Sequence, residues 1–374
     1  MIIENIFQGS GIPNRRAAMF FKTEPFYTNV DRYTHTNNWE IIQSIRILNS
    51  RGYVVDLIDR GVSNWTPKHR YDLFLGLGVG NTGRHFARYS NLSQARKSIL
   101  LAMGPQPDIS NQRTLERYEM FNNRTGLNAP PMRTVSEVTG DKYLDIVSEA
   151  DYIFSIGGKD TQSYKSFLNS GLPVLNFYPS SSPKISYSSE WLKTRERNSF
   201  LCFAGNGFIC KGVDLVLEAF LGDDAKELHI CGPNSESIFF EYYGEKIKQA
   251  PNIFYHGFIE PGGDVFNSLA SKCSYVVFHS AAEGCCTSVA TAMRAGLVPM
   301  INSWTGINVS GIGIELPESG DIIRTIKDET DKASKISDDD YTSMVNSTIL
   351  KAQDFSQESY TRTYAEALDT VIRS

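Results

Sequence analysis

Two short stretches of this chain carry side chains that could hold an anion, and each follows an apolar run. Lys211-Gly212 comes after Phe200–Gly205, and the stretch from Glu283 to Ser288 comes after Tyr275–Ser280. The second stretch, Glu-Gly-Cys-Cys-Thr-Ser, also opens a run of helical composition at Thr287–Ala295. Free backbone N–H groups and the dipole at a helix start attract negative charge. The two strand–loop–helix units could therefore bind one anion, and the carboxylate of Glu283 could bind sugar hydroxyls. Together they predict a nucleotide-sugar site.

The length and composition of the chain place it among globular proteins. It has 374 residues, 41% hydrophobic and 21% charged, which allows two domains of ordinary size. No apolar run approaches the roughly 18 residues of a membrane span, and the first residues lack the pattern of a signal peptide. The six cysteines form no C-x-x-C pair, so neither a zinc site nor a disulfide framework is expected. Cysteines in apolar runs favour a reducing, cytoplasmic location, with the inner face of the membrane as an alternative.

Charge is distributed unevenly along the chain. Residues 1–198 contain 24 Lys and Arg against 18 Asp and Glu, whereas residues 199–374 contain 13 against 24. A basic half joined to an acidic half suggests two domains with different partners. The acidic total and the lack of a recognised binding module argue against nucleic acid. The basic residues of the first half could face an anionic membrane or a lipid-pyrophosphate acceptor, or they could be scattered solvated charges. These residues are Arg15, Arg16, Lys22, Arg84, Arg88, Arg96 and Lys97, with Phe20 and Phe21 nearby.

Short apolar runs alternate with helix-like stretches, which predicts parallel sheets covered by helices on both faces. Such sheets bind ligands beyond the carboxyl ends of their strands, where Lys211 and Glu283 lie. In the second half, the expected strands are Phe200–Gly205, Glu227–Cys231, Asn252–Phe258, Tyr275–His279 and Val298–Asn302, and the expected helices are Gly212–Leu221, Ser237–Ala250, Gly263–Ser271 and Ser288–Ala295. In the first half, the expected strands are Ala17–Phe21, Val54–Ile58, Leu73–Leu77, Ser98–Met103, Tyr152–Ile156 and Val174–Phe177, with a helix at Trp39–Ser50.

Several segments of the second half occur in an order that resembles the nucleotide-binding domain of GT-B-fold glycosyltransferases. They are Phe203–Gly207 with Lys211–Asp214, Leu228–Gly232, Asn252–Phe258, Glu283-Gly284 with Ala292–Pro299, and Phe355-Ser356 before the last helix. The group most similar is the retaining glycosyltransferase family four (group 1), and the resemblance covers most of residues 199–316. It implies an α/β fold with two Rossmann-like domains facing across a cleft.

The resemblance also implies roles for particular residues. Glu283 would be the catalytic residue and would orient the donor sugar. The donor diphosphate would be bound by Lys211, Asn206, Gly205, Gly284, Thr287 and Ser288, and the nucleoside by Gly257, Phe258, Ile259 and Thr291. GT-B enzymes generally work without a catalytic metal, so neither a metal nor another cofactor is expected. The acidic run Asp338-Asp339-Asp340 precedes a helix, where acids complement the dipole.

The chain departs from the family pattern at three positions. The family commonly has a second acidic residue, which holds the ribose, at the position of Thr291, and an arginine at the position of Asn206. An arginine fork makes two charge-assisted bonds to phosphate, whereas Asn offers one neutral donor. The family also often places a histidine just past the strand that matches Leu73–Leu77. Here Gly78 follows that strand, and His85 is the nearest substitute.

Gly78-Val79-Gly80-Asn81-Thr82-Gly83 fits the dinucleotide fingerprint after a strand, but a single match is weak. The fingerprint requires an acid at the end of the next strand, and Ser98–Met103 ends in Gly104-Pro105 instead. We therefore expect Gly78 and Gly80 to let the backbone approach the donor or acceptor, with His85 nearby on the same side.

The expected organisation is an acceptor-side domain at residues 1–178, a linker at 179–198 and a nucleotide-sugar domain at 199–353. A final helix at 354–374 is expected to pack back toward the N-terminal domain. The implied activity is that of a hexosyltransferase-type glycosyltransferase, which moves a sugar from a nucleotide-diphosphate sugar to a glycan or lipid-linked acceptor with retention, in surface polysaccharide or glycan assembly.

Other interpretations of the same residues remain open. Glu283 could be an acid that complements a helix dipole, Lys211 a solvated lysine, and Thr287 and Ser288 ordinary caps. At the level of function, the alternatives are a nucleotide-sugar epimerase or phosphorylase of the GT-B fold, and a non-catalytic sugar-nucleotide-binding protein.

Overall fold

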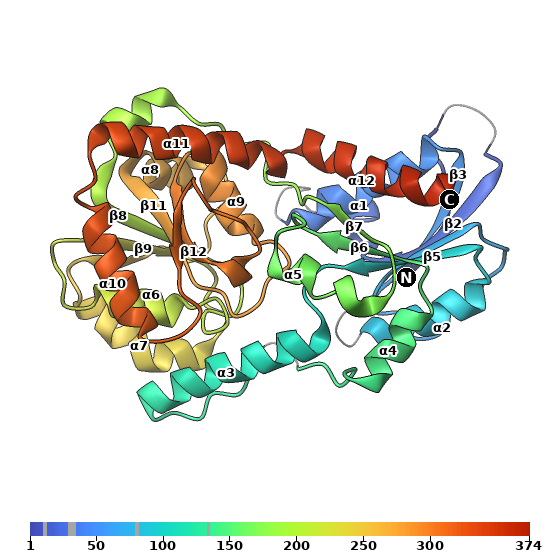
Figure 1. The fold of residues 1–374 in the computed structure, drawn as a ribbon, viewed down its shortest axis with the longest axis horizontal. Coiled ribbons are helices and arrows are strands. Elements are labelled where there is room, and N and C mark those ends of the chain that lie inside the picture. Colours follow the sequence, from blue (N-terminus) through green and yellow to red (C-terminus); the bar gives the residue numbers. More distant parts are fainter. Residues whose placement is uncertain (10–12, 29–34, 79–81, 133–134) are drawn as a thin grey trace. The chain divides into compact units, whose positions relative to one another are not determined.

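The computed structural model describes residues 1–9, 13–28, 35–78, 82–132 and 135–374 (Figure 1). Contacts divide the chain into two compact units. Unit 1 consists of Met1–Asn111, Val135–Ser180 and Gln357–Ser374, and unit 2 consists of Gln112–Thr134 and Ser181–Ser356. In this division residues 112–134 and the segment from Ser181 onward, which was expected to be a linker, belong to unit 2.

Unit 1 is built on a seven-stranded sheet in the order β1-β3-β2-β4-β5-β6-β7. Neighbouring strands are parallel except at the edge, where β1 runs antiparallel to β3. Strands β2 to β6 are apolar and largely buried because helices cover both faces: α1 and α12 lie over one face, and α2 and α4 over the other (Figure 1). The strands are β1 Ile2–Ile6, β2 Arg15–Phe21, β3 Tyr53–Asp59, β4 Leu73–Leu77, β5 Lys97–Ala102, β6 Tyr152–Ile156 and β7 Val174–Phe177. The helices are α1 Asn37–Asn49, α2 Gly83–Ser93, α4 Asp141–Ser148, α5 Gln162–Lys165 and α12 Gln357–Arg373.

Unit 2 is built on a six-stranded parallel sheet in the order β10-β9-β8-β11-β12-β13. Figure 1 shows α8, α9 and α11 over one face and α6, α7 and α10 over the other. The strands are β8 Glu196–Phe203, β9 Glu227–Cys231, β10 Ile253–Tyr255, β11 Cys273–Phe278, β12 Val298–Asn302 and β13 Ile314–Leu316. The helices are α6 Val213–Phe220, α7 Ser237–Gln249, α8 Asp264–Lys272, α9 Thr287–Arg294, α10 Ile322–Ala333 and α11 Asp338–Ala352.

The strand order of unit 2 determines where a ligand can bind. If β8 is counted as the first strand of this unit, the order becomes 3-2-1-4-5-6, which is that of a Rossmann fold. The chain leaves β8 toward one edge of the sheet and leaves β11 toward the other. The crevice beyond the carboxyl ends of these two strands is therefore the switch point at which such sheets bind ligands.

One long helix, α3 Pro107–Thr125, was not predicted from the sequence. Its residues from Gln112 onward belong to unit 2. They attach to unit 2 through polar side chains: Tyr118 donates to Glu236 at 2.5 Å, and Arg124 pairs with Asp214 on α6. Phe121 lies among them with 0% exposure and packs edge-on against Tyr243 of α7.

Candidate functional site

The candidate site lies at the switch point of unit 2, on the loops that follow β8 and β11. These loops contain Lys211 and Glu283, which are separated by about seventy residues of sequence. The strands that carry them pair in register, with Tyr275 opposite Phe200 and Val276 opposite Leu201. Their carboxyl ends therefore lie side by side, and the two loops meet.

Lys211 and Glu283 form an ion pair in which Lys211 Nζ lies 2.5 Å from Glu283 Oε1. Both side chains are largely shielded from solvent, with 13% and 16% exposure. Lys211 Nζ also lies 5.7 Å from the ring centre of Phe278, the last residue of β11. The structure thus brings together the residue predicted to hold phosphate and the residue predicted to hold sugar. The opposite charges of the two side chains neutralise each other in this ion pair.

The loop after β8 is a tight turn that ends at a glycine. Lys211 N donates to the Gly207 carbonyl at 3.1 Å, and Val213 N donates to the Phe208 carbonyl at 2.9 Å. Gly212 caps α6 with a φ of +69°, a conformation that L-residues with a side chain rarely adopt. A Cβ at Gly212 would lie 2.2 Å from the His279 carbonyl oxygen. Glycine at position 212 therefore allows the two loops to touch.

The loop after β11 is fixed by backbone hydrogen bonds on both sides. Ala281 N donates to the Cys210 carbonyl at 2.8 Å, which joins it to the loop after β8. Glu283 N donates to the Trp304 carbonyl at 2.9 Å, and Cys286 N donates to the Thr305 carbonyl at 3.0 Å. These bonds join it to the segment after β12, so the position of the Glu283 carboxylate depends on three loops.

The residues predicted for the diphosphate lie at the ends of β8 and at the start of α9. Gly205 and Asn206 are exposed at the end of β8, and a Cβ at Gly205 would lie 3.8 Å from Lys211 Cε. Gly284 precedes α9, whose first two residues, Thr287 and Ser288, are half-buried. Cys286 is the N-cap residue; burial raises the pKa of its thiol, so it is neutral at physiological pH.

The residues predicted for the nucleoside are more dispersed. Gly257, Phe258 and Ile259 follow β10, which is two strands away from β8. The Gly257 carbonyl accepts from Gly232 N at 2.8 Å, Phe258 is 61% exposed and Ile259 is buried. Thr291 is buried within α9. Across the described ranges, no hydrogen bond joins these four residues to Lys211 or Glu283.

The residues predicted for the acceptor side lie in unit 1. Gly78 follows β4, and a Cβ there would lie 2.2 Å from Leu100 Cγ, so this glycine admits a neighbouring side chain. Gly80 lies outside the described residues. His85, on α2, packs against the rings of Phe20 and Tyr89, with ring centres 5.9 Å and 5.8 Å away, and partial burial lowers its pKa.

The two phenylalanines near the basic residues of the first half are buried rather than exposed. Phe20 and Phe21 are buried in β2 because their apolar rings belong to the core of unit 1. Arg16 pairs with Asp56, Arg84 pairs with Glu137, and Lys97 donates to the Val371 carbonyl. Phe20 and Phe21 therefore cannot contribute to a membrane-facing surface, and membrane contact by the basic residues stays a prediction.

Neither a metal-type cluster nor a membrane-spanning helix occurs among the described residues. In the described ranges, no three His, Cys, Asp or Glu side chains come close enough to hold a metal ion. Asp338, Asp339 and Asp340 lie in the first turn of α11, where Ser337 Oγ accepts from Asp340 N. None of the described helices is both long and apolar enough to cross a membrane.

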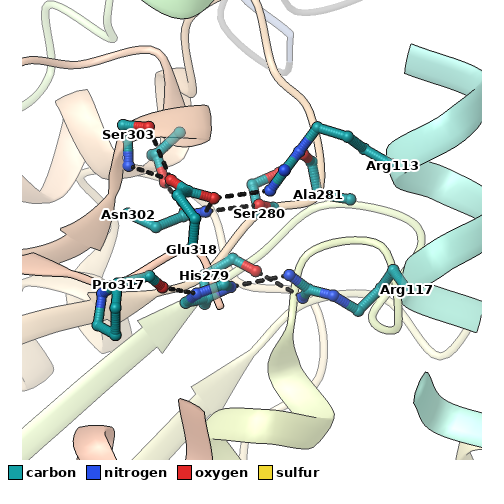
Figure 2. Close-up of polar contacts among 10 residues, drawn as sticks. Arg113, Arg117, His279, Ser280, Ala281, Asn302, Ser303, Pro317 and Glu318 are labelled. Atoms are coloured by element: carbon teal, nitrogen blue, oxygen red, sulfur yellow. Dashed lines mark hydrogen bonds and ion pairs between the residues drawn. The ribbon is translucent and has the colours of Figure 1, made fainter. Parts of the chain in front are cut away.

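A partly buried polar network lies beside the Glu283 loop and was not predicted (Figure 2). Arg113 on α3 donates to the Ala281 carbonyl at 2.5 Å and to Glu318 at 2.7 Å. Glu318 also accepts from the backbone N and hydroxyl of Ser303, at 2.9 Å and 2.7 Å. Arg117, one turn further along α3, donates to the His279 carbonyl at 2.7 Å. Arginines spaced four residues apart with Phe121 on the same helix face were the sequence signal that could have revealed this network.

The hydrogen bonds of His279 assign its tautomer. Nε2 lies 2.8 Å from the Pro317 carbonyl oxygen, so this nitrogen is the donor and carries the proton. Nδ1 then accepts from Arg117 at 2.8 Å. Burial, with Arg117 adjacent, lowers the pKa of His279 to about 3, so the ring is neutral at physiological pH.

Comparisons with known proteins identify the fold. No protein-family model matches the chain, and neither does any curated protein. Among solved structures, it is similar to HepE from Anabaena in complex with UDP and glucose, with a TM-score of 0.62 and 11% identity, over 96% of this chain and 100% of that one. It is also similar to sucrose-phosphate synthase from Thermosynechococcus elongatus, with a TM-score of 0.65 and 10% identity, and to a glycosyltransferase from Rickettsia africae, with a TM-score of 0.62 and 10% identity. Each of these two similarities covers 96% of this chain and 100% of the other. The chain therefore has the GT-B fold with two Rossmann-like units, as the resemblance predicted.

Proposed function

We propose that this protein is a glycosyltransferase that moves a sugar from a nucleotide-diphosphate sugar to a glycan or lipid-linked acceptor. The observation that carries the proposal is the Lys211–Glu283 pair at the switch point of a sheet with Rossmann strand order. A cation and a carboxylate held together at this place match a ligand with an anionic part and a hydroxyl-rich part. The similar structure of Anabaena HepE in complex with UDP-glucose supports a donor of this class.

The mechanism follows from the charges of the site. When the donor binds, its diphosphate competes with Glu283 for Lys211, and the carboxylate becomes available to sugar hydroxyls. Cleavage of the sugar–phosphate bond places negative charge on the departing diphosphate. Lys211 and the backbone N–H groups of Gly284, Thr287 and Ser288 would stabilise this charge through groups that are already oriented. Gly205 and Asn206 would contact the same diphosphate.

The remaining parts of the proposal rest on the resemblance alone. Gly257, Phe258, Ile259 and Thr291 would contact the nucleoside, and unit 1 would hold the acceptor. The transfer would retain the anomeric configuration, and the reaction would be part of surface polysaccharide or glycan assembly in the cytoplasm or at the inner face of the membrane.

A second candidate, a sugar-nucleotide-binding protein without catalysis, is favoured by Asn206 and Thr291, which stand where the family has an arginine and an acid. Titration calorimetry with UDP-, GDP-, ADP- and dTDP-sugars, followed by a search for products, distinguishes the two. Binding together with sugar transfer or slow donor hydrolysis supports the transferase. Binding without turnover supports the binding protein, and a new sugar nucleotide as product supports an epimerase. No binding to any member of the panel would overturn the proposal.

The proposed mechanism requires no metal, because Lys211 and the start of α9 supply the positive charge. We therefore expect the transfer rate to persist after treatment with EDTA and dialysis into metal-free buffer. Loss of activity on chelation that magnesium or manganese restores would contradict this mechanism.

A further inference from the structure

Arg117 is a buried arginine whose direct hydrogen bonds go only to uncharged groups. It is 3% exposed, and its guanidinium donates to the backbone carbonyl and to the ring Nδ1 of His279. His279 is neutral, as shown above. Within the described ranges, no carboxylate lies at ion-pair distance from Arg117. Burial lowers its pKa, yet a guanidinium stays protonated at neutral pH.

The other arginines that α3 contributes to unit 2 have different environments. Arg113 pairs with Glu318 at 2.7 Å, and Arg124 pairs with Asp214 and Glu218. The buried carboxylate of Asp214 is a counter-charge near Arg117, but its hydrogen bond comes from Arg124 and it makes no direct bond to Arg117. A buried charge without a bonded counter-ion is costly, so its presence calls for an explanation.

The position of Arg117 supplies one. A Cβ at Gly212 would lie 2.6 Å from Arg117 Nη1, so the guanidinium is directly behind the residue that follows Lys211. Gly212 is also the N-cap of α6, where the helix dipole is itself positive. Arg117 therefore adds positive charge to a place that already carries Lys211 and a helix start. Lys211 is paired with Glu283, so an anion bound in front of this loop would compensate all three once it replaced Glu283 as the partner of Lys211.

We propose that Arg117 is a positioning residue that also supplies positive potential to the donor diphosphate, without touching it. This inference rests on the proposed function and deepens it. Its guanidinium ties the loop after β11, through the carbonyl and ring of His279, to α3, and it lies next to Gly212 of the loop that carries Lys211. Its charge acts across a short path of buried, low-dielectric protein, where screening by water is weak. The charge of Arg117 would thus replace part of the positive charge that the resembled family has in an arginine at the position of Asn206.

The test is the preference of the protein for a nucleoside diphosphate over the corresponding nucleoside. UDP, GDP, ADP and dTDP are titrated into the full-length wild type, and the one that binds is compared with its nucleoside. We expect Arg117→Met to weaken diphosphate binding by about tenfold or more and nucleoside binding by less than about twofold, because only the diphosphate carries the charge that Arg117 attracts. Arg117→Lys should recover most of the preference, since it keeps the charge.

Three further variants separate charge from packing. Arg117→Gln keeps a donor for the His279 carbonyl and loses the charge, so it should behave like Arg117→Met and replaces it if that variant does not fold. Arg113→Met removes another arginine that contacts the loop after β11, but the charge of Arg113 is neutralised by Glu318. This variant should therefore affect diphosphate binding and nucleoside binding more equally. Arg324→Met changes an exposed arginine of α10 and should bind as the wild type does.

The outcomes distinguish this inference from the proposed function. Equal losses of diphosphate and nucleoside affinity in Arg117→Met and Arg117→Gln would show a purely structural role and overturn it. So would a lysine variant no better than the glutamine variant. If the wild type binds none of the four diphosphates, the proposed function itself fails. If it binds one and the Arg117 variants keep the wild-type preference, only the role of Arg117 fails.

Discussion

At the scale of single residues, the central feature is that Lys211 and Glu283 bind each other at 2.5 Å. A partly buried pair of this kind makes the two residues interdependent, because removal of one charge leaves the other without its neutralising partner. Under the proposed function, the diphosphate takes over the role of Glu283 as the partner of Lys211. The two residues should therefore give opposite effects on nucleotide binding when each is changed.

Glu283→Gln is expected to separate binding from turnover. The amide keeps the shape but not the charge of Glu283, so diphosphate binding no longer requires the ion pair between Lys211 and Glu283 to break. Diphosphate affinity should stay at the wild-type level or rise. The transfer rate should fall at least about tenfold, because a charge-assisted bond to the sugar is lost in the transition state. Calorimetry and a transfer assay measure the two quantities, and a variant that transfers sugar at the wild-type rate would show that Glu283 only complements the dipole of α9.

Lys211→Ala is expected to reduce diphosphate affinity strongly and nucleoside affinity little. One charge-assisted contact contributes roughly 1.5–3 kcal/mol. The loss should be greater than this, because Glu283 then faces the diphosphate as an unpaired anion. Combining Lys211→Ala with Glu283→Gln should therefore restore part of the diphosphate affinity that the single change removes. Additive effects in this double-mutant cycle would mean that the pair is not coupled to the ligand.

At the scale of elements, the site depends on the close approach of loops. Ala281, Cys210, Glu283 and Trp304 join the loops after β8, β11 and β12 through their backbones. Gly212 lies where two of these loops touch and where Arg117 approaches from α3. Because the contact is made by backbone atoms, its tolerance for even one methyl group should be small.

Gly212→Ala is expected to be far more destabilising than Gly222→Ala. Both glycines have positive φ, +69° and +75°, so both changes incur a similar backbone strain of about 1–2 kcal/mol. Only at Gly212 does the new Cβ meet atoms, 2.2 Å from the His279 carbonyl oxygen, whereas nothing lies within 4 Å at Gly222. The clash should add about 1–3 kcal/mol. Urea denaturation of the two variants measures the difference, and equal losses would show that the loops can move apart without cost.

The sequence predicted strands more reliably than it predicted the network that supports the site. Leu73–Leu77, Tyr152–Ile156 and Val298–Asn302 end where predicted, because apolar runs bounded by polar residues are a local signal. Helix α3 was missed because its buried face consists largely of arginines and tyrosine, whose partners are distant in sequence. The ion pair between Lys211 and Glu283 was also beyond local patterns, since only the strand order places the two loops together.

At the scale of the whole molecule, the two units contain buried groups that titrate in opposite senses. In unit 1, burial raises the pKa of Glu40 to about 7, although its carboxylate accepts from Ser180 N. In unit 2, burial lowers the pKa of His279 to about 3 and that of His229 to about 4. A raised pKa of a carboxyl group makes folding more favourable as the pH falls, whereas lowered pKa values of histidines make folding less favourable. Acidification should therefore change the stability of the two units in opposite directions.

The sign of each effect follows from comparing folded and unfolded states. Unfolded histidine binds a proton near pH 6.5, whereas folded His279 and His229 do not, so unit 2 loses stability as the pH falls from about 6.5 toward 4. Folded Glu40 binds a proton near pH 7 and unfolded glutamate only near 4.5, so unit 1 gains stability over the same fall in pH. Between pH 7 and pH 5, each of these groups contributes about 2 kcal/mol.

We therefore expect a change from pH 7 to pH 5 to lower the stability of unit 2 relative to that of unit 1. Hydrogen exchange in low denaturant, corrected for the intrinsic pH dependence of exchange, should show protection decreasing in β8 and β11 while β2 and β4 keep or gain theirs. Glu40→Gln should abolish the gain in unit 1 and leave unit 2 unchanged, because the amide does not titrate. Glu358→Gln, an exposed change on α12, is the matched control and should behave as the wild type. Parallel loss of protection in both units at pH 5 would mean that Glu40 does not hold a proton in the folded protein, and that its hydrogen bonds from Ser180 outweigh its burial.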